Sequence, residues 1–418
     1  MKSKLKVVVV GGGAGGMMAA GKAAQNGASV LLIEKNKRLG KKILISGQGR
    51  CNLTNTANIE EIINNFPGNG KFLYSALTNF SNLDLMAFFK ERGVELKIER
   101  GGRVFPNSDS SGEIVKALEN YLAEQQVQIL RGVSVVDIKT NGEKVEGVIL
   151  ADSREILGDR VIIATGGASF PGTGSTGDGY NLAQRLGHSI VPIRPSLIPL
   201  EVKEEWAKDL QGLSLKNVTV ILQTTTGKKL AQAFGEMLFT HFGVSGPIIL
   251  TISRKAVDYW QKNYLPLILK IDLKPALNKE KLDQRLQRDI VKFSNKQIKN
   301  GLGDLLPQRL IMPVINLAGI NVDKVMHQIT KEERRKIIDV LKGLQVTLIG
   351  SRPLNEAIVT AGGVNVKEVN PQTMESKLIK GLYFAGEVLD IDGLTGGYNL
   401  QAAFSTGYTA GNFASMLN

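Results

Sequence analysis

Residues 7–16 read VVVVGGGAGG and lead into an alanine-rich segment that ends at Gly27. The next residues, 29–33, read SVLLI, and Glu34 follows them. This order of apolar strand, glycine turn, helix, second strand and acid is typical of a dinucleotide-binding βαβ unit. It predicts such a unit over residues 5–34 and places the chain in the α/β class.

The glycines of this turn match the pattern G-x-G-x-x-G at Gly11, Gly13 and Gly16. We expect Gly11 to allow the tight turn and Gly13 to let the backbone approach a pyrophosphate, since it has no Cβ. Gly16 should let the helix pack closely on the strand. The N–H groups at the helix start, at Ala14 and Gly15, would face the phosphates with a partial positive charge.

Glu34 stands where such units place the acid that accepts hydrogen bonds from both ribose hydroxyls. A 2′-phosphate would meet this carboxylate, so the sequence disfavours NADP at this site. Lys35, the next residue, is a further candidate cofactor contact. The motif alone does not separate FAD from NAD.

The composition is that of a globular protein of two or three domains, with 418 residues, 43% of them hydrophobic and 22% charged. Cys51 is the single cysteine, which excludes an intramolecular disulfide and fits a reducing cytoplasm. The apolar run after the first lysines is broken by glycines and is needed as the first strand, so we do not expect a signal peptide. No stretch is long enough to span a bilayer, and we expect a cytoplasmic protein without membrane association.

Lysine and arginine exceed aspartate and glutamate by 52 to 39, a net charge of +13. This excess suggests either nucleic-acid binding or a solvated basic surface. The densest basic region, residues 279–299, mixes both charge signs and contains one aromatic residue, Phe293. The pattern favours the solvated surface, so we expect a small-molecule substrate rather than a nucleic-acid partner. The oligomeric state stays open.

Hydrophobic periodicity and turn residues predict the remaining organisation. Helical stretches are expected over 59–92, and Ser110 and Glu113 form a predicted capping box that opens a helix to about Gln126. Asn141-Gly142 predicts a hairpin between strands at 133–138 and 145–150. The predicted domains are a dinucleotide-binding domain over 1–192 and 356–418, a β-rich insert over 193–277 and 341–355, and a helical insert over 278–340.

Two later segments also carry residues that can bind a nucleotide cofactor. A predicted buried strand runs into Ala164, Thr165 and Gly166. Near the end of the chain, a strand at 382–384 runs into Gly386-Glu387, and a glycine-rich turn then opens a long helix. An acid and helix N–H groups placed there can bind ribityl hydroxyls and the pyrimidine edge of a flavin. A dehydrogenase that binds only NAD does not need this second group of cofactor-contacting residues near the end of the chain, so the cofactor we expect is FAD.

Four further blocks of sequence are distinctive: Gly40–Lys42 with Ser46–Asn55, Phe239–Pro247, Thr360–Val364 and Gly386–Asn399. With the N-terminal motif they resemble the two-dinucleotide-fold flavoproteins of the glutathione reductase superfamily. They resemble more closely the bacterial flavoprotein family of aminoacetone oxidases and BaiN-type bile-acid enone reductases. The resemblance implies a Rossmann-like FAD-binding domain interrupted by an insert with a β-barrel-like part and a helical part.

The loop after the second strand supplies further candidate cofactor residues. Arg50 is expected to face the pyrophosphate or the flavin, with a loop salt bridge as the alternative. Cys51 lacks a resolving cysteine and is expected to be structural. The remaining candidate cofactor residues are Lys42, Ser46, Gly47, Gly49, Asn52, Val135, Gly362, Gly363, Gly397, Tyr398 and Asn399.

The candidate catalytic residues are His241, Thr360 and Tyr398. We expect the substrate to lie between the flavin, Thr360–Gly363, Tyr398 and the His241 block, with a structural histidine as the alternative for His241. His188 and His327 are interpreted as structural, and no spacing predicts a metal site.

These features predict an FAD-dependent oxidoreductase that exchanges hydride with a small organic substrate at flavin N5. Two reactions stay open: oxidation of an amine such as an α-aminoketone, with oxygen as acceptor, and reduction of an activated C=C bond. The alternatives are an FAD-containing nucleic-acid-binding or RNA-modification protein and a flavoprotein without turnover. No second G-x-G-x-x-G motif directly follows a strand and opens a helix, so NAD(P)H stays open only as a transient electron donor.

Overall fold

A computed structural model describes residues 4–263 and 265–416, and the chain divides into two compact units. Unit 1 comprises Met1–Pro195 and Leu354–Asn418, and unit 2 comprises Ser196–Pro353. Unit 2 lies within the range 193–355 predicted for the insert. The ends of the predicted FAD-binding domain, residues 1–3 and 417–418, lie outside the described residues.

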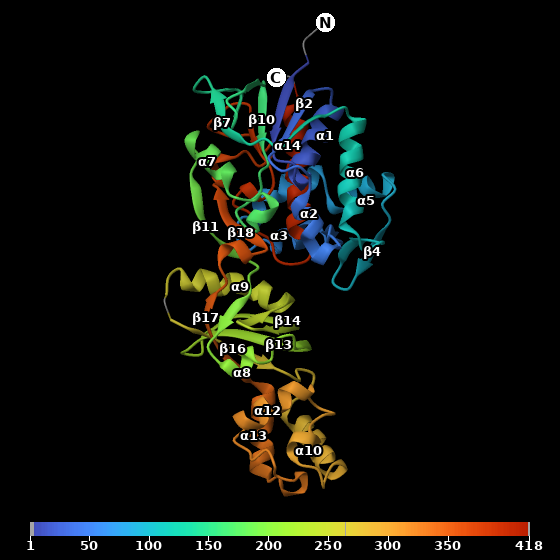
Figure 1. Ribbon diagram of the computed structural model, residues 1–418, viewed down its shortest axis with the longest axis vertical. Helices are drawn as coiled ribbons and strands as arrows, with labels where there is room; N and C mark the ends of the chain where they lie inside the picture. The colour runs from blue at the N-terminus through green and yellow to red at the C-terminus, as the bar shows by residue number, and fades with distance from the viewer. Residues whose placement is uncertain (1–3, 264, 417–418) are drawn as a thin grey trace. The chain divides into compact units, whose positions relative to one another are not determined.

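The core of unit 1 is a parallel five-stranded sheet in the order β19-β10-β1-β2-β6 (Figure 1). The five strands are β1 (Lys6–Val10), β2 (Ser29–Glu34), β6 (Gln128–Arg131), β10 (Arg160–Ile163) and β19 (Leu382–Phe384). Valine and isoleucine fill β1 and β10, which are buried almost throughout, as expected for central parallel strands. The sheet confirms the predicted Rossmann-like α/β class.

Helices α1 (Ala14–Gln25) and α14 (Tyr398–Ala414) pack on each other through small residues. A Cβ on Gly407 would lie 2.3 Å from the carbonyl oxygen of Gly15, and one on Gly411 would lie 2.3 Å from that of Ala19. The two close approaches advance by four residues in both helices. The helices therefore run parallel, and α14 can be this close only because glycine lacks a side chain.

Smaller elements complete unit 1. Its short sheets are β3-β5-β4, β7-β8-β9 and β11-β18. Their strands are β3 (Thr54–Asn55), β4 (Leu96–Glu99), β5 (Arg103–Pro106), β7 (Val135–Thr140), β8 (Val145–Leu150), β9 (Glu155–Leu157), β11 (Ile190–Ser196) and β18 (Val359–Val364). The helices are α2 (Lys41–Ile45), α3 (Ile59–Asn64), α4 (Tyr74–Asn79), α5 (Asn82–Glu91), α6 (Ser111–Glu124) and α7 (Asp178–Arg185).

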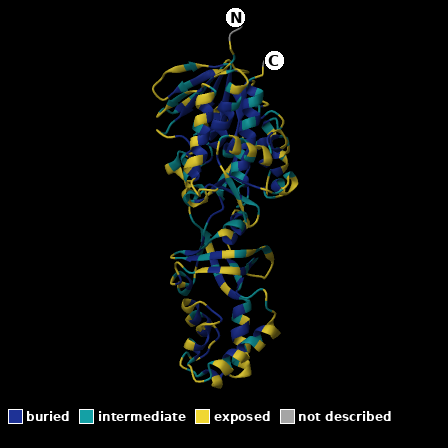
Figure 2. Cartoon of the chain, turned by 90° about the vertical axis from the view of Figure 1, so that its right-hand side faces the viewer, coloured by how far each residue is buried: buried dark blue, intermediate teal, exposed yellow. Residues whose placement is uncertain are grey.

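Unit 2 is built on a closed antiparallel barrel in the order β12-β15-β14-β13-β16-β17. Its strands are β12 (Leu200–Val202), β13 (Ser214–Thr224), β14 (Lys229–Thr240), β15 (Gly243–Ser245), β16 (Leu267–Asp272) and β17 (Leu344–Ser351). Inward residues such as Val220, Leu222 and Leu269 are fully buried. Figure 2 shows buried and exposed positions alternating along these strands, as a half-buried sheet requires.

The helices of unit 2 are α8 (Glu205–Lys208), α9 (Pro247–Trp260), α10 (Lys279–Lys292), α11 (Ile298–Gly301), α12 (Gln308–Leu317) and α13 (Lys331–Lys342). Their buried residues join those of the barrel in one hydrophobic cluster. The finer division into a β-rich and a helical insert therefore stays a prediction.

Two local predictions have different outcomes. The hairpin at Asn141-Gly142 is present, with β7 and β8 antiparallel and the N–H of Asn141 donating to the carbonyl of Lys144 at 3.1 Å. Helix α6 begins after Ser110 as predicted, but the prediction of a capping box is wrong. In the described structure the Ser110 side chain caps nothing, and the N–H of Glu113 donates instead to the Ser110 carbonyl.

Within the described ranges, no helix combines the length and the apolar character that a membrane crossing demands.

Candidate cofactor site

The turn between β1 and α1 has an open side and a closed side. Gly11 has φ +107°, and a Cβ there would lie 2.5 Å from the carbonyl oxygen of Ala164. A Cβ on Gly16 would lie 1.8 Å from the carbonyl oxygen of Gly11. By contrast, no described heavy atom lies within 4 Å of the position that a Cβ on Gly13 would take. The turn therefore packs through Gly11 and Gly16 and leaves space at Gly13.

The start of α1 is free to bind an anion. Among the described residues, no side chain caps this helix and no acid lies in its first turn. Its first N–H groups, at Ala14, Gly15 and Gly16, thus carry the positive end of the helix dipole without a neutralising partner. A pyrophosphate fits this donor set, because its oxygens accept such N–H bonds.

Glu34 ends β2 next to this turn and is 8% exposed. Its Oε2 accepts the N–H of Gly12 at 2.7 Å, and its Oε1 accepts the N–H of Asn36 at 2.7 Å. These bonds fix the carboxylate beside the glycine turn, as the ribose interpretation requires. The side chain of Lys35 forms an ion pair with Asp178, with 2.6 Å between Nζ and Oδ2.

Helix α14 offers a second uncapped start. Its N-cap residue is Gly397, with φ +95°, and in the described structure it has neither a side-chain cap nor an acid in its first turn. Because Gly407 faces Gly15 and the helices run parallel, the start of α14 lies about 12 Å beyond the start of α1 at 1.5 Å per residue. The positive ends of the two helices therefore point in the same direction and are offset along their shared axis direction. This arrangement suits an extended dinucleotide, whose phosphates and ring lie at separate positions.

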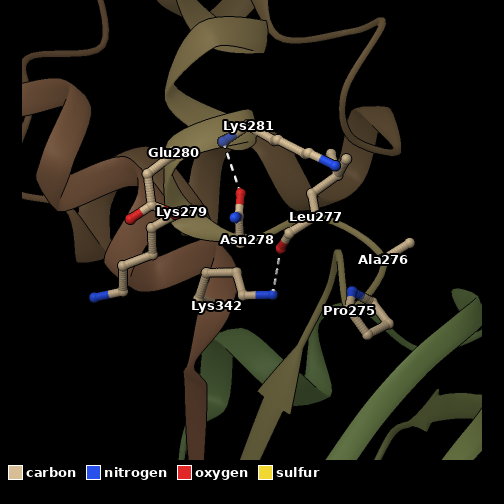
Figure 3. A pocket seen from close by; sticks show the side chains of 8 residues that line it. All are labelled: Pro275, Ala276, Leu277, Asn278, Lys279, Glu280, Lys281 and Lys342. Atoms are coloured by element: carbon tan, nitrogen blue, oxygen red, sulfur yellow. Dashed lines mark hydrogen bonds between the residues drawn. The ribbon is translucent and has the colours of Figure 1, made fainter.

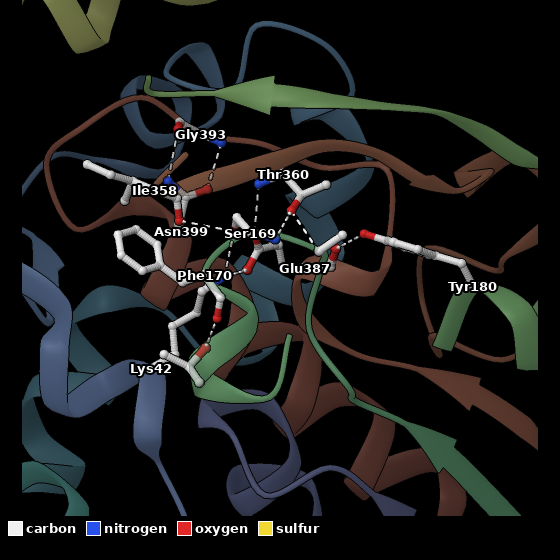
Figure 4. A network of polar contacts seen from close by, with 11 residues as sticks. Lys42, Ser169, Phe170, Tyr180, Ile358, Thr360, Glu387, Gly393 and Asn399 are labelled. Carbon is white, nitrogen blue, oxygen red and sulfur yellow. Dashed lines mark hydrogen bonds and ion pairs between the residues drawn. The ribbon is translucent and has the colours of Figure 1, made fainter. Parts of the chain in front are cut away.

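A polar network joins α2, the loop after β10, β18 and the segment after β19 (Figure 4). The Nζ of Lys42 donates to Oε2 of Glu387 at 2.7 Å and to Oγ of Ser169 at 2.9 Å. Oε1 of Glu387 accepts the N–H of Thr360 at 2.7 Å. Both charged side chains retain some exposure, 29% for Lys42 and 19% for Glu387. The predicted residues Lys42, Thr360 and Glu387 are thus brought together.

Thr360 is fully buried in this network. Its Oγ1 accepts the N–H groups of Ala168 and Ser169 at 2.9 and 3.0 Å. The hydroxyl therefore holds the loop that follows Ala164, Thr165 and Gly166. The contacts give Thr360 a loop-holding role, and its catalytic role stays a prediction.

The loop over residues 46–52 lies against the start of α14. With its amide oriented to satisfy both partners, Asn52 accepts the N–H of Gly397 at 3.1 Å and donates to the carbonyl of Thr54 at 3.2 Å. Gly47 and Gly49 both have positive φ, which shapes this loop. Oγ of Ser46 donates to the carbonyl of Ile43 at 2.7 Å.

Arg50 forms the loop salt bridge rather than pointing freely at a cofactor. Its guanidinium pairs with Glu99 and with Asp109, the latter at 2.7 Å, and stacks on the ring of Phe105. The hydrogen bond with Asp109 raises the pKa of Arg50. The structure thus contains the loop salt bridge that the sequence left open as the alternative.

Cys51 is fully buried in the same loop. Burial raises the pKa of its thiol to about 12, although a hydrogen bond with Ser46 acts in the opposite direction. A thiol with this pKa is not a nucleophile at neutral pH. The structural interpretation of Cys51 fits this environment.

Gly362 and Gly363 serve backbone packing. A Cβ on Gly362, which has φ +88°, would lie 2.3 Å from the carbonyl oxygen of Pro192. One on Gly363 would lie 2.7 Å from that of Val388. A bulky residue at 362 would therefore separate β18 from β11.

Tyr398 and Asn399 shape the turn before α14. The ring of Tyr398 covers Gly396, where a Cβ would lie 2.6 Å from Cε2, and burial raises the pKa of its hydroxyl. The amide of Asn399 accepts the N–H of Gly393 and donates to its carbonyl, both at 2.8 Å. Both residues stabilise the turn, and a substrate role for Tyr398 stays a prediction.

Three further predicted residues, Val135, Gly386 and His241, have the following surroundings. Val135 is buried at the start of β7, and the N–H of Gly386 donates to Oγ1 of Thr406 at 2.9 Å. His241 is exposed in the turn between β14 and β15 of unit 2. Across the described residues, no group of three or more His, Cys, Asp or Glu side chains is arranged to hold a metal ion.

Unit 2 contains an open hollow of about 660 Å³ at the start of α10 (Figure 3). The Nζ of Lys342 crosses it to the carbonyls of Leu277 and Lys274, at 2.7 and 3.0 Å. The residues around it are Pro275, Ala276, Leu277, Asn278, Lys279, Glu280, Lys281 and Lys342. None of the predicted site residues lies here, so the hollow is not the cofactor site.

Residues 5–413 match the family model described as HI0933-like protein Rossmann domain. The chain belongs to this HI0933-like family. It is 33% identical over 391 residues to a 3-dehydro-bile acid delta(4,6)-reductase of Clostridium scindens, with 93% of each chain covered. It is 35% identical over 389 residues to a ribosomal RNA dihydrouridine synthase of Haemophilus influenzae, with 92% of each covered.

Solved structures share the fold of the HI0933-like chain. The 3-ketosteroid delta1-dehydrogenase of Sterolibacterium denitrificans gives a TM-score of 0.53 at 13% identity, covering 98% of this chain and 99% of that one. The 3-ketosteroid-delta4-(5alpha)-dehydrogenase of Rhodococcus jostii RHA1 also gives 0.53, at 15% identity, covering 100% and 98%. Family and fold together confirm the predicted resemblance and the prediction of an FAD-dependent oxidoreductase.

The site of this HI0933-like protein fits FAD on its own residues: the open position at Gly13, the fixed carboxylate of Glu34 and the two parallel helix starts. The sequence analysis missed Ser169, which is fully buried and contacts both Lys42 and Glu387. It also missed Thr406, whose hydroxyl accepts the N–H of Gly386. The only available signal was that Ser169 lies within a glycine-rich stretch, which does not reveal a partner more than 200 residues away.

Proposed function

We propose that this protein is an FAD-dependent reductase of C=C bonds conjugated to a carbonyl group. The single observation that carries the proposal is what two relatives of about one-third identity have in common. One is named for reducing the Δ4,6 double bonds of a 3-dehydro bile acid, and the other for converting uridine into dihydrouridine. The scaffolds of these substrates differ, but each reaction saturates a C=C bond in conjugation with a carbonyl. Reduction is therefore favoured over amine oxidation.

The residues that would hold FAD lie in unit 1. The N–H groups at the start of α1 would bind the pyrophosphate, and Glu34 would accept the ribose hydroxyls. Glu387, fixed by Lys42 and Thr360, would face the ribityl and flavin half with the start of α14. FAD bound there would supply hydride transfer at N5. The positive end of α14 would stabilise negative charge at the pyrimidine edge.

The proposed reaction adds a hydride and a proton across the double bond. One carbon of the substrate double bond accepts a hydride from the reduced cofactor, and the other accepts a proton, so the substrate gains two hydrogens. The electron pair comes from an external donor, for which NAD(P)H is the class we propose. The conjugated carbonyl takes up negative charge as the hydride arrives, which makes such bonds easier to reduce than isolated ones.

Anaerobic reoxidation of the reduced holoenzyme tests this proposal. The enzyme is reduced with dithionite to its end point and mixed with 2-cyclohexenone or with uridine-containing RNA, while the flavin absorbance is followed. Aminoacetone is mixed with the oxidised enzyme in parallel. We expect a conjugated C=C substrate to restore the oxidised spectrum and to appear as a product with two more hydrogens. The proposal is overturned if neither C=C substrate reoxidises the flavin, and also if aminoacetone instead reduces the oxidised enzyme.

Glu34→Lys and Glu60→Gln provide a matched pair for the cofactor part of the proposal. The first removes the carboxylate that Gly12 holds beside the turn, so we expect purified protein with little FAD. The second changes an exposed acid on α3 and should leave the FAD content unchanged.

A specific observation favours uridine in RNA as the substrate over a free small molecule. Unit 2 contains 25 lysines and arginines but 15 aspartates and glutamates, a net charge of +10 out of the +13 of the whole chain. The positive charge is therefore concentrated in the unit without the cofactor residues. A free bile-acid-like substrate would not require this distribution, whereas a polyanion would benefit from it.

A further inference from the structure

The outer face of the barrel in unit 2 has an unusual composition. Strand pairing aligns its outward side chains in three rows across β14, β13, β16 and β17. The rows are Phe234-Thr219-Asp272, Gln232-Ile221-Lys270-Gln345 and Lys229-Gln223-Ile268-Thr347. We call these residues the outer face. It presents three amides, two hydroxyls, two lysines, one carboxylate, two isoleucines and one aromatic ring, while the inward positions between them are apolar and mostly buried.

Phe234 is the residue of the outer face that most clearly indicates a binding surface. Its side chain is 55% exposed in the middle of a long strand, and its cross-strand neighbour Thr219 is too small to cover it. Neighbouring outward positions carry side chains that donate and accept hydrogen bonds, namely Gln232 and Gln223. An exposed ring beside such groups on a β-surface is how unpaired nucleobases are stacked and bound.

The cations of unit 2 are only partly compensated. Eleven of the 25 form ion pairs with acids of the same unit. In the described part of the chain no direct ion pair is found for the other 14, although Lys296 and Lys331 lie near enough to Asp304 and Asp283 to lower the pKa of these acids. Four of these cations lie on or beside the outer face: Lys216, Lys228, Lys229 and Lys270.

The acids near this face do not cancel these charges. Asp272, at the end of the first row, pairs with Lys342 at 2.6 Å. Glu236, two residues beyond Phe234, is the one exposed acid on this side of β14 and marks the edge of the face. The second and third rows contain Lys270 and Lys229 and no acid, and the carboxylate of Glu204 accepts the N–H of Thr347 at the end of the third row.

We propose that the outer face binds single-stranded RNA, with a base stacked on Phe234 and the backbone phosphates on Lys228, Lys229 and Lys270. This inference rests on the proposed function, since it specifies the polymer that carries the conjugated double bond. Unpaired RNA is the occupant because only an unpaired base offers a free ring face to Phe234. The excess positive charge supplies the affinity that is independent of sequence.

Fluorescence anisotropy with a labelled 12-nucleotide uridine-rich RNA tests the proposal on the FAD-loaded protein. Phe234→Ala should weaken binding about 5- to 100-fold, the range expected for the loss of one stacked base. The double variant Lys228→Gln/Lys229→Gln should weaken RNA binding. It should also reduce the slope of log K against log salt concentration by about 1.4, since each phosphate contact on a single strand contributes about 0.7 to this slope.

The control variants are Lys90→Gln, an exposed lysine of unit 1, and Leu157→Ala, which removes an exposed apolar side chain of similar accessibility from unit 1. Both should bind the RNA like the unchanged protein. Equal weakening by Lys90→Gln would overturn the assignment. So would binding of poly-glutamate or of a duplex as tight as that of the single strand, since either would indicate unspecific attraction or a partner of another class.

Flavin content and reoxidation by 2-cyclohexenone, measured on the same variants, separate the two proposals. All variants should match the unchanged protein in both, because the outer face lies outside the cofactor unit. If the unchanged protein reduces cyclohexenone but does not bind RNA, this inference fails and the proposed function stands. If RNA binds through these residues but no conjugated C=C bond reoxidises the flavin, the proposed function fails and the surface assignment stands.

Discussion

The Nζ of Lys42 lies 2.7 Å from Oε2 of Glu387, although 345 residues separate them in the chain. This ion pair ties α2, which follows the nucleotide-binding unit, to the segment before α14. It therefore links the two halves of the candidate cofactor site. Side chains at about one-quarter exposure are screened less than surface pairs, so the link contributes to stability as well as to position.

Lys42→Met should disrupt this link while keeping the length of the side chain. Glu387 would then lose its cationic partner, and we expect the free energy of unfolding to fall by about 1–2 kcal/mol. The FAD dissociation constant should rise about tenfold. Urea unfolding and FAD titration measure these effects, with Lys71→Met as an exposed control. Unchanged values in both measurements would show that the pair does not support the site.

Thr360→Val should destabilise the protein although the two side chains have nearly the same shape. The substitution removes the oxygen that accepts the N–H groups of Ala168 and Ser169. Leaving two largely buried donors without an acceptor should cost about 2 kcal/mol in unfolding free energy. Thr78→Val is the control, since the Thr78 hydroxyl is exposed and bonds only within its own helix. Equal stability of both variants would contradict the loop-holding role.

The Cys51 thiol should be almost inert in the folded protein. Its pKa of about 12 leaves on the order of one thiolate in ten thousand at pH 8, and burial also blocks access. We expect its reaction with Ellman's reagent to be at least about a thousandfold slower than in urea-unfolded protein. Rapid labelling of the folded protein would contradict this environment. Cys51→Ser should retain the flavin spectrum and turnover.

His188 should make the protein less stable at acidic pH. Burial lowers its pKa, while Glu368, with Oε2 at 3.3 Å from Nδ1, acts in the opposite direction. The unfolded chain therefore binds a proton more readily than the folded one. The stability that the neutral ring contributes is complete above the ordinary histidine pKa of about 6.5 and is lost as the pH falls.

Thermal unfolding between about pH 7.5 and pH 5.5 measures this effect. His188→Gln should show a weaker loss of stability on acidification than the unchanged protein. His327→Gln, which changes an exposed histidine of unit 2, should follow the unchanged protein. A slope for His188→Gln that equals that of the unchanged protein would assign the acid sensitivity to other groups.

Much of the cofactor unit could be predicted because its signals are local. The glycine spacing at Gly11, Gly13 and Gly16 and the acid at Glu34 lie within one short segment. Their roles follow from the geometry of a strand, a turn and a helix. The contacts of Arg50 and Gly362 could not be predicted in the same way. The sequence shows a cation and a glycine, but not that Glu99 and Asp109 surround the first or that the Pro192 carbonyl lies against the second.

The sequence by itself determined the α/β class and the βαβ unit, since both depend on residue types at fixed short spacings. It also indicated FAD and the family, through motif blocks spread along most of the chain. Only the tertiary structure decided which distant residues meet: Lys42 with Glu387, Thr360 with the loop after β10, and the parallel starts of α1 and α14. It also decided that Phe234 and Lys270 lie on one outward face, because the pairing register of β13, β14 and β16 sets that arrangement. Contacts between remote segments depend on how whole elements pack, and no local pattern encodes that packing.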